Sequence, residues 1–394
     1  MQPFDLIIVG GGLTGTSLAA ALRESRLRIA LIEAQASPAL PLSAEAWDSR
    51  VYAISPANAA FLARIGVWAH LDPERMAAVR QMRVQGDRGG SLTFSAFETG
   101  VQELAWIMES SLIARELREG IKRQANLTRF CPAAPLTLDI GENAATLTLK
   151  DGQTLTARLV VGADGRDSWV RQQTRLTVSD QPYRTQGVVA NFTTEKPHRG
   201  TAWQWFRDDG ALAWLPLPGK RISIVWSTPD DHAATLLALS PEALAERVAE
   251  AGGHLLGKLA PLTPAAAFPL RLIRVPRTVA PRLALAGDAA HGIHPLSGHG
   301  VNLGFQDTEA LAHLLNAAPP WQDIGEARFL ERFQRARKEE TLLLQSATDA
   351  IARLFDARAP AAPLFSRLAN FGLTLTDRAL PLKNLLARYA LGAL

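Results

Sequence analysis

The chain has 394 residues, of which 47% are hydrophobic and 20% charged, and this composition is typical of a folded globular protein. The single cysteine, Cys131, excludes an intramolecular disulfide. The net charge of +4 is spread over scattered Lys and Arg residues, so no basic stripe indicates binding to nucleic acid.

The N-terminus predicts a protein of the cytoplasm. Residues 1–12 lack the basic start and long apolar core of a signal peptide. No run of eighteen apolar residues follows, so no transmembrane helix is expected.

The chain opens with a β-α-β pattern. Residues 4–9 are an apolar run that predicts a strand buried on both faces, residues 14–24 predict a helix, and residues 28–32 predict a second buried strand. This order is the start of a doubly wound α/β fold.

A glycine loop joins the first strand to the helix. Residues 10–15 (GGGLTG) match G-x-G-x-x-G, in which Gly10 permits the tight turn, Gly12 lets the backbone approach a pyrophosphate, and Gly15 lets helix and strand pack closely. Glu33 ends the second strand, where a carboxylate can accept hydrogen bonds from an adenosine ribose. The segment predicts a dinucleotide site.

The next elements alternate between helix and hairpin. Periodicity and turn residues predict a helix over 55–66 ending at Gly66, a hairpin from 80–85 and 91–97, a long amphipathic helix over 102–124, and a hairpin from 144–150 and 154–161.

The second half of the chain changes in character. Residues 178–272 are rich in strands and carry four tryptophans, which are expected to be mostly core residues, with one or two able to wall a substrate pocket: Trp203, Trp205, Trp214 and Trp226. A short strand is predicted over 282–286. Helix is predicted from Gly300 onward, broken by a linker at 357–363.

These elements predict a discontinuous domain organisation. Residues 1–75, 100–177 and 275–345 are expected to form a Rossmann-like nucleotide-binding domain. Residues 76–99 and 178–274 are expected to form an inserted, mainly antiparallel sheet domain for substrate, and 346–394 a helical C-terminal region.

Two further segments have the form of an apolar strand that ends in a Gly/Asp turn. They are residues 160–168 (VVGADGRDS) and residues 285–307, which begin LAGD. One such turn usually marks only a loop, but three glycine-rich strand ends in one α/β chain point to a common site.

Together the three segments resemble the class A flavoprotein aromatic hydroxylases, from Phe4 to the helix after Asp307. Within that class the chain looks most like the hydroxylases of ubiquinone biosynthesis, on residues 48–55 (DSRVYAIS), 212–217 (LAWLPL) and above all 287–307. It departs from that family at His299, where a Gln usually stands between the two glycines.

The resemblance implies FAD as cofactor and NAD(P)H as co-substrate. The residues it assigns to FAD are Gly10, Gly12, Leu13, Thr14, Gly15, Glu33, Arg50, Asp164, Gly165, Gly287, Asp288, Pro295, Gly298, Gly300, Val301 and Asn302. Pro295 would lie over the flavin, and the backbone amides of Val301 and Asn302 would face its pyrimidine edge. The positive end of a helix starting at Gly300 would stabilise the anion of reduced flavin.

Histidines near this segment are the remaining candidates for chemistry. His291 and His294 form an H-x-x-H pair, but no third ligand accompanies them and no metal is predicted. His294 and His299, with Pro295, are the catalytic candidates; a hydrogen-bonded structural histidine is the alternative for each.

The implied reaction is hydroxylation of the ring of a polyprenylated phenol by O2 through a flavin hydroperoxide. Two alternatives stay open, a hydroxylase of a small soluble aromatic metabolite and a non-catalytic flavoprotein scaffold in a biosynthetic complex. Residues 380–391 read as an amphipathic helix, with Lys383 and Arg388 available to anionic lipid. That helix could serve peripheral contact with the inner membrane or pack on protein.

Overall fold

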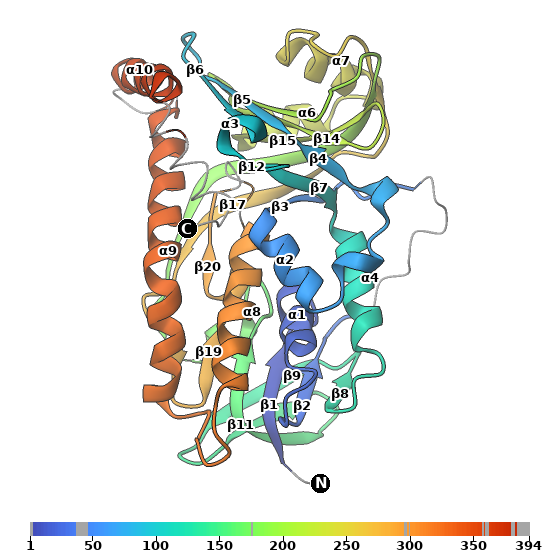
Figure 1. The fold of residues 1–394 in the computed structure, drawn as a ribbon. Helices are drawn as coiled ribbons and strands as arrows, with labels where there is room; N and C mark the ends of the chain where they lie inside the picture. Colours follow the sequence, from blue (N-terminus) through green and yellow to red (C-terminus); the bar gives the residue numbers. More distant parts are fainter. Residues whose placement is uncertain are drawn as a thin grey trace.

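The computed structural model describes residues 3–36, 46–174, 176–294, 298, 300–356, 358, 362–379 and 383. Their strands form three sheets. Figure 1 shows one sheet in the lower part of the molecule and a second across its upper part.

The first sheet has eight strands: β1 (Phe4–Val9), β2 (Ile29–Ile32), β8 (Leu127–Phe130), β9 (Pro135–Ile140), β10 (Ala145–Leu149), β11 (Thr154–Gly162), β18 (Val279–Ala280) and β19 (Leu283–Leu285). Five of them run parallel in the order β19-β11-β1-β2-β8. The carboxyl ends of β1, β2 and β11 therefore meet at one edge, where ligands bind in sheets of this kind.

Strand β1 is buried on both faces, as its apolar run predicts. Leu6 and Ile8 belong to a core shared with the helices, whereas Ile7 and Val9 pack under the β9–β10 arm. The helices on the first face are α1 (Leu13–Ala21), α2 (Pro56–Arg64), α4 (Ser110–Ile121) and α8 (Gly300–Asn316), together with the start of α9 (Ala327–Leu354).

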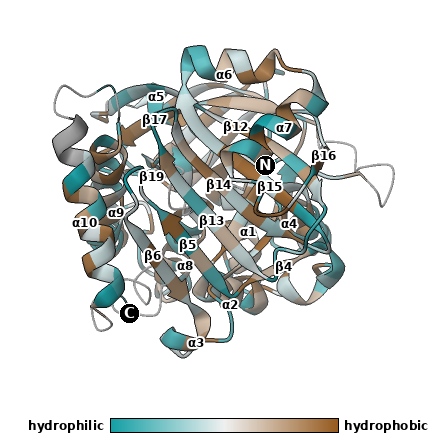
Figure 2. Ribbon diagram, turned by 90° about the horizontal axis from the view of Figure 1, so that it is seen from above, coloured by the Kyte–Doolittle hydropathy of each residue, from teal (hydrophilic) through white to brown (hydrophobic). Residues whose placement is uncertain are grey.

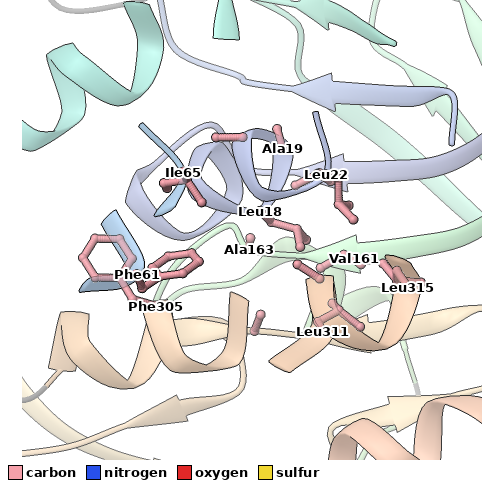
Figure 3. Close-up of a cluster of buried hydrophobic side chains, with 14 of the residues drawn as sticks. Leu18, Ala19, Leu22, Phe61, Ile65, Val161, Ala163, Phe305, Leu311 and Leu315 are labelled. Atoms are coloured by element: carbon pink, nitrogen blue, oxygen red, sulfur yellow. The ribbon is translucent and has the colours of Figure 1, made fainter. Parts of the chain in front are cut away.

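Helices α1 and α8 pack closely where the glycine loop begins the first of them. Figure 3 shows Leu18 of α1 and Leu311 of α8 in one cluster with Val161 of β11. A Cβ on Gly304 would lie 2.8 Å from Oγ1 of Thr14, so the two helices approach at a residue without a side chain. Thr14 and Gly304, nearly 300 residues apart in sequence, thus lie side by side.

The second sheet has nine strands: β5 (Gln81–Gln85), β6 (Ser91–Ser95), β12 (Ser179–Thr194), β13 (Thr201–Arg207), β14 (Gly210–Leu217), β15 (Arg221–Pro229), β16 (Leu259–Pro261), β17 (Ala266–Arg274) and β20 (His291–Gly292). All its neighbours are antiparallel except β13 and β5. Figure 2 shows β13, β14 and β15 side by side, seen from above.

The four tryptophans of this sheet are core residues, as the alternation predicts. All four belong to one buried cluster behind the sheet. That cluster also contains residues of α6 (Asp230–Leu237) and α7 (Pro241–Ala251), two helices that the strand-rich reading of 178–272 did not include. The start of α7 has a readable signal, because Ser240 caps the helix and Pro241 follows it.

A third sheet corrects one prediction. It consists of β3 (Val51–Ile54), β4 (Ala77–Val79) and β7 (Ala105–Glu109), so the first part of the predicted helix over 102–124 is a strand. β7 pairs with β3 and β4, and these partners lie far upstream in sequence. Local periodicity does not reveal such long-range pairing. Here the pairing makes residues 105–109 a strand, and the helix begins only at Ser110.

The remaining helices are α3 (Ala96–Thr99), α5 (Trp169–Gln173), α9 (Ala327–Leu354) and α10 (Ala362–Arg378), with short 3₁₀ turns at Trp68–His70, Pro73–Arg75 and Gly287–Ala289. In Figure 1, α9 runs beside both large sheets and α10 lies near β6. Within the described ranges, no helix has the length and apolar character needed to cross a membrane. The predicted α/β class is confirmed, and the division into residue ranges given above stays a proposal.

Candidate functional site

A cavity of about 920 Å³ extends from the glycine loop to the second sheet. Thirteen of the sixteen residues expected to contact FAD line it: Gly10, Gly12, Leu13, Thr14, Glu33, Arg50, Asp164, Gly165, Asp288, Gly298, Gly300, Val301 and Asn302. Gly15 and Gly287 are not among the lining residues. Pro295 and His299, named as a cofactor contact and as catalytic candidates, lie outside the described residues.

The glycines of the first loop have different physical roles. Gly10 has φ of +107°, and a Cβ there would lie 2.4 Å from the carbonyl oxygen of Ala163. A Cβ on Gly15 would lie 1.9 Å from the carbonyl oxygen of Gly10. Both positions therefore require glycine for packing, whereas a Cβ on Gly12 would meet no atom within 4 Å and would project toward the cavity.

The Glu33 carboxylate is held in a fixed orientation at the end of β2. Its Oε2 accepts a 2.8 Å hydrogen bond from the N–H of Gly11, and its Oε1 accepts one of 2.8 Å from the N–H of Gln35. Because a carboxylate can accept further hydrogen bonds, Glu33 can also bind a ligand hydroxyl in the cavity.

Two helix N-termini meet the cavity. Gly12 caps α1 without a side-chain hydrogen bond, so the first N–H groups of that helix have no acceptor inside it. Gly300 and Val301 begin α8 and also line the cavity. Both ends present a positive helix dipole, which favours negative charge in the cavity.

The Asn302 side chain has a structural role that the sequence did not reveal. Its Oδ1 accepts a 3.0 Å hydrogen bond from the N–H of Ser55, and its Nδ2 donates one of 2.7 Å to the carbonyl oxygen of Ala53. The side chain thereby fixes the start of α8 to the junction of β3 and α2.

The Arg50 backbone is anchored by carboxylates. Asp48 Oδ1 accepts a 2.9 Å hydrogen bond from the N–H of Arg50, and Glu109 Oε1 accepts one of 2.6 Å from the N–H of Asp48. Burial raises the pKa of Glu109, although bonds from Asp48 and Arg75 oppose the shift. The anchored backbone leaves the Arg50 side chain at the cavity wall.

Asp164 organises its own turn. Its carboxylate accepts hydrogen bonds from Oγ of Ser168 at 2.5 Å and from the N–H of Val170 at 3.0 Å. Burial raises the pKa of Asp164, and these bonds partly oppose it. The same turn is tied to the third segment by Arg171, which sequence reasoning missed: its guanidinium donates to the carbonyl oxygens of Arg166 at 2.7 Å and Ala289 at 2.8 Å.

The third segment is fixed by Asp307. Gly287, with φ of +61°, donates its N–H to Oδ2 of Asp307 at 2.9 Å. His291 and Arg337 bind the same carboxylate. Burial raises the pKa of Asp307, but the charges of His291 and Arg337 outweigh it and lower the pKa overall.

His294, a catalytic candidate from the sequence, is not among the residues that line the cavity. It is buried and stacks edge-on against Tyr183, with ring centroids 4.9 Å apart. Burial lowers its pKa to about 4, so the imidazole is neutral at pH 7. His291 pairs with Asp307 rather than with His294, and no three potential ligands converge on a metal position in the described ranges.

The far end of the cavity is formed by the second sheet. Strands β13, β14 and β15 present mostly small side chains to the cavity, including Ala202, Ala211, Ala213 and Val225, whereas β5, β6 and β17 add the larger Met82, Phe94 and Phe268. Trp203 is the one tryptophan of the four that also lines it. Since small residues leave space above a sheet, this face can accept a ring.

The residues present fit FAD. The cavity is lined by residues of the glycine loop, of residues 160–168 and of residues 285–307. Gly12 leaves room for a pyrophosphate, and Glu33 lies at the end of β2. The uncapped N–H groups at the start of α1 match a phosphate. The positive end of the α8 dipole matches a ring that gains negative charge.

The comparisons with known proteins agree with this geometry. Residues 4–340 match the family model described as FAD binding domain. Ubiquinone hydroxylase UbiL of Rhodospirillum rubrum is 36% identical over 393 residues, covering 99% of this chain and 90% of that protein. The 3-demethoxyubiquinol 3-hydroxylase of Escherichia coli is 33% identical over 395 residues, covering 99% of both chains.

A solved structure shares the fold. The crystal structure of P. aeruginosa PqsL in complex with 2-aminobenzoylacetate matches with a TM-score of 0.77 at 23% identity, covering 94% of this chain and 100% of that one.

Proposed function

The chain belongs to the FAD binding domain family, and from this premise we propose that it is an FAD-dependent monooxygenase that hydroxylates the aromatic ring of a polyprenylated phenol in ubiquinone biosynthesis. The observation that carries the proposal is the similarity, over nearly the whole length of each chain, to proteins named as hydroxylases of ubiquinone and demethoxyubiquinol.

FAD is the cofactor, and the described lining of the cavity indicates how it is held. Glu33 would bind the adenosine ribose, and the N–H groups at the start of α1 would bind the pyrophosphate beside Gly12. Arg50, Asp164, Gly165 and Asp288 would complete the contacts along the cavity.

When bound, FAD supplies the redox chemistry by which NAD(P)H and O2 are used for hydroxylation. The chain supplies orientation and exclusion of water. The N-terminal N–H groups of α8 would stabilise negative charge on the flavin ring. The small apolar residues of β13, β14 and β15 would keep water from the reacting ring, which limits unproductive release of hydrogen peroxide.

Product analysis tests the proposed function. The purified holoprotein, given NAD(P)H, O2 and a set of polyprenyl phenols, is expected to release a hydroxylated phenol with consumption of one NAD(P)H per product. Hydroxylation of small soluble phenols but of no polyprenyl phenol would show that the substrate is a small soluble aromatic metabolite instead. Bound FAD that NAD(P)H reduces in the absence of oxygen, with no product from any phenol, would favour a scaffold role.

We also propose that the enzyme works at the inner membrane surface, because the tail of a polyprenyl substrate lies in the bilayer. Helix α10 supports this, since Leu368, Phe371 and Leu375 recur at helical spacing and are 56%, 68% and 54% exposed. The predicted lipid-facing helix over 380–391 lies outside the described residues except for Lys383. That side chain is buried against Glu98, with Nζ 2.8 Å from Oε2. The prediction that Lys383 is available to lipid is therefore wrong.

A further inference from the structure

The second sheet has two faces of opposite character. On β13, β14 and β15 the large residues Trp205, Trp214 and Trp226 point to the core behind the sheet. The residues between them point to the cavity and are mostly small. In this register Gln204 lies opposite Ala213, and Ser227 lies opposite Ala211.

Gln204 and Ser227 are polar exceptions on this small, apolar face. They are only 6% and 7% exposed, and both line the cavity. Neither side chain makes a hydrogen bond to any residue that the structure describes. Ser223 of β15 differs, because it is fully buried and does not line the cavity.

Buried amide and hydroxyl groups are costly unless they find partners. A Gln side chain offers two N–H donors and a carbonyl acceptor, and a Ser hydroxyl can donate or accept. The groups at this end of the cavity therefore match a ligand with oxygen substituents. The three arginines in the lining, Arg50, Arg118 and Arg166, belong to no strand of this sheet, so uncharged oxygens suit it better than a carboxylate.

We propose that Gln204 and Ser227 are specificity-determining residues that bind the uncharged oxygen substituents of the substrate ring, one substituent each. This inference rests on the proposed function, which places an oxygen-substituted ring at this end of the cavity. Donors built to meet a ring oxygen reject analogues that lack it, because the buried donor is then left unpaired.

A binding cycle on the oxidised holoenzyme tests the inference. The probe is 2-geranyl-6-methoxyphenol, with two analogues that lack either the hydroxyl or the methoxy group, titrated by the change in flavin absorbance. Gln204→Met and Ser227→Ala are each expected to raise the Kd of the parent probe about fivefold to tenfold, the ratio that one neutral hydrogen bond contributes. Each variant should also lose the discrimination against one of the two analogues.

Ser223→Ala is the matched control, since it removes a hydroxyl from the same strand outside the cavity, and its Kd should equal that of the wild type. Stoichiometric FAD in every variant excludes a folding defect. Wild-type affinity in both cavity variants, or equal weakening for the parent and both analogues, would overturn the assignment of these residues. Failure of the wild-type protein to bind any of the three probes would instead overturn the proposed function, and this inference with it.

Discussion

Nε2 of His291 lies 2.5 Å from Oδ2 of Asp307, and both side chains are buried. The same carboxylate accepts hydrogen bonds from the N–H of Gly287 and, at 2.9 Å, from Nε of Arg337. One side chain on α8 therefore fixes the turn after β19 and connects it to α9.

Replacing this carboxylate is expected to be strongly destabilising. Asp307→Asn removes the negative charge between His291 and Arg337 and leaves buried cationic donors poorly paired, so the free energy of unfolding should fall by about 3–5 kcal/mol. Urea unfolding of the holoprotein measures it. The control is Glu309→Gln on the same helix, whose ion pair with Arg64 is exposed and should contribute less than about 1 kcal/mol. Similar losses for the two variants would contradict a special role of Asp307.

The pH dependence of stability should carry a contribution from His294. Its folded pKa of about 4 is lower than its ordinary 6.5, so the unfolded chain takes up the proton first as the pH falls. The contribution of neutral His294 to the free energy of unfolding is complete well above pH 6.5. It decreases by about 3 kcal/mol as the pH falls toward 4. His294→Gln should therefore lose less stability than the wild type between pH 7 and pH 4. Parallel losses in urea titrations at the two pH values would disprove the contribution.

Cofactor retention should depend on the open side of Gly12. Gly12→Val places methyl groups in the cavity, so bound FAD after gel filtration should fall about tenfold or more, because the pyrophosphate loses its position. Gly120→Val is the control: a Cβ at Gly120 also meets no atom within 4 Å, but the residue lies on α4 outside the cavity lining. Full FAD in both variants would show that the loop is not the phosphate site.

The tryptophans behind the second sheet should act mainly on stability. Trp214 is fully buried, and Trp214→Ala should lower the free energy of unfolding by about 3–5 kcal/mol through the cavity it leaves. Trp321→Ala removes a tryptophan that is 82% exposed and should change stability little. Chemical denaturation of both variants gives the comparison, and a small effect at Trp214 would mean that the core repacks around the gap.

Membrane association should depend on the apolar stripe of α10. Phe371→Asp with Leu375→Asp is expected to reduce flotation with anionic liposomes several-fold, since charged groups oppose insertion at the interface. Trp321→Asp, which removes an exposed aromatic residue elsewhere, should leave flotation unchanged. If the wild type does not float, or if the double variant floats as well as the wild type, the stripe on α10 does not mediate membrane association.

The elements predicted correctly are those whose signals lie close together in sequence. The β1-α1-β2 unit, the β5–β6 and β10–β11 hairpins and the start of α8 follow from periodicity and glycine turns close in sequence. Strand β7 was missed because its partners β3 and β4 are distant in sequence. The first turn of α7 shows the opposite case, where Ser240 and Pro241 gave a local signal that could have been used.

The site was predictable at the level of segments and less so at the level of side chains. Asp307 was visible in the motif, but its contacts to His291 and Arg337 depend on how α8 and α9 pack. The same holds for Arg171 and for the amide of Asn302, whose partners are backbone carbonyls and N–H groups. A single sequence carries no sign of which backbone atom a polar side chain will meet.

Helix α9 spans 28 residues and is bonded to α8 and to strands of the second sheet. In its first half Arg337 binds Asp307 of α8. In its second half Gln345 donates to the carbonyl oxygens of Ile273 and Gly292, and Asp349 accepts from the hydroxyl of Tyr183. The helix is a rigid connection between α8 and the second sheet along one side of the molecule. A movement of the second sheet away from α8 would have to break these bonds or turn about α9, so we expect any widening for a long substrate on the side away from this helix.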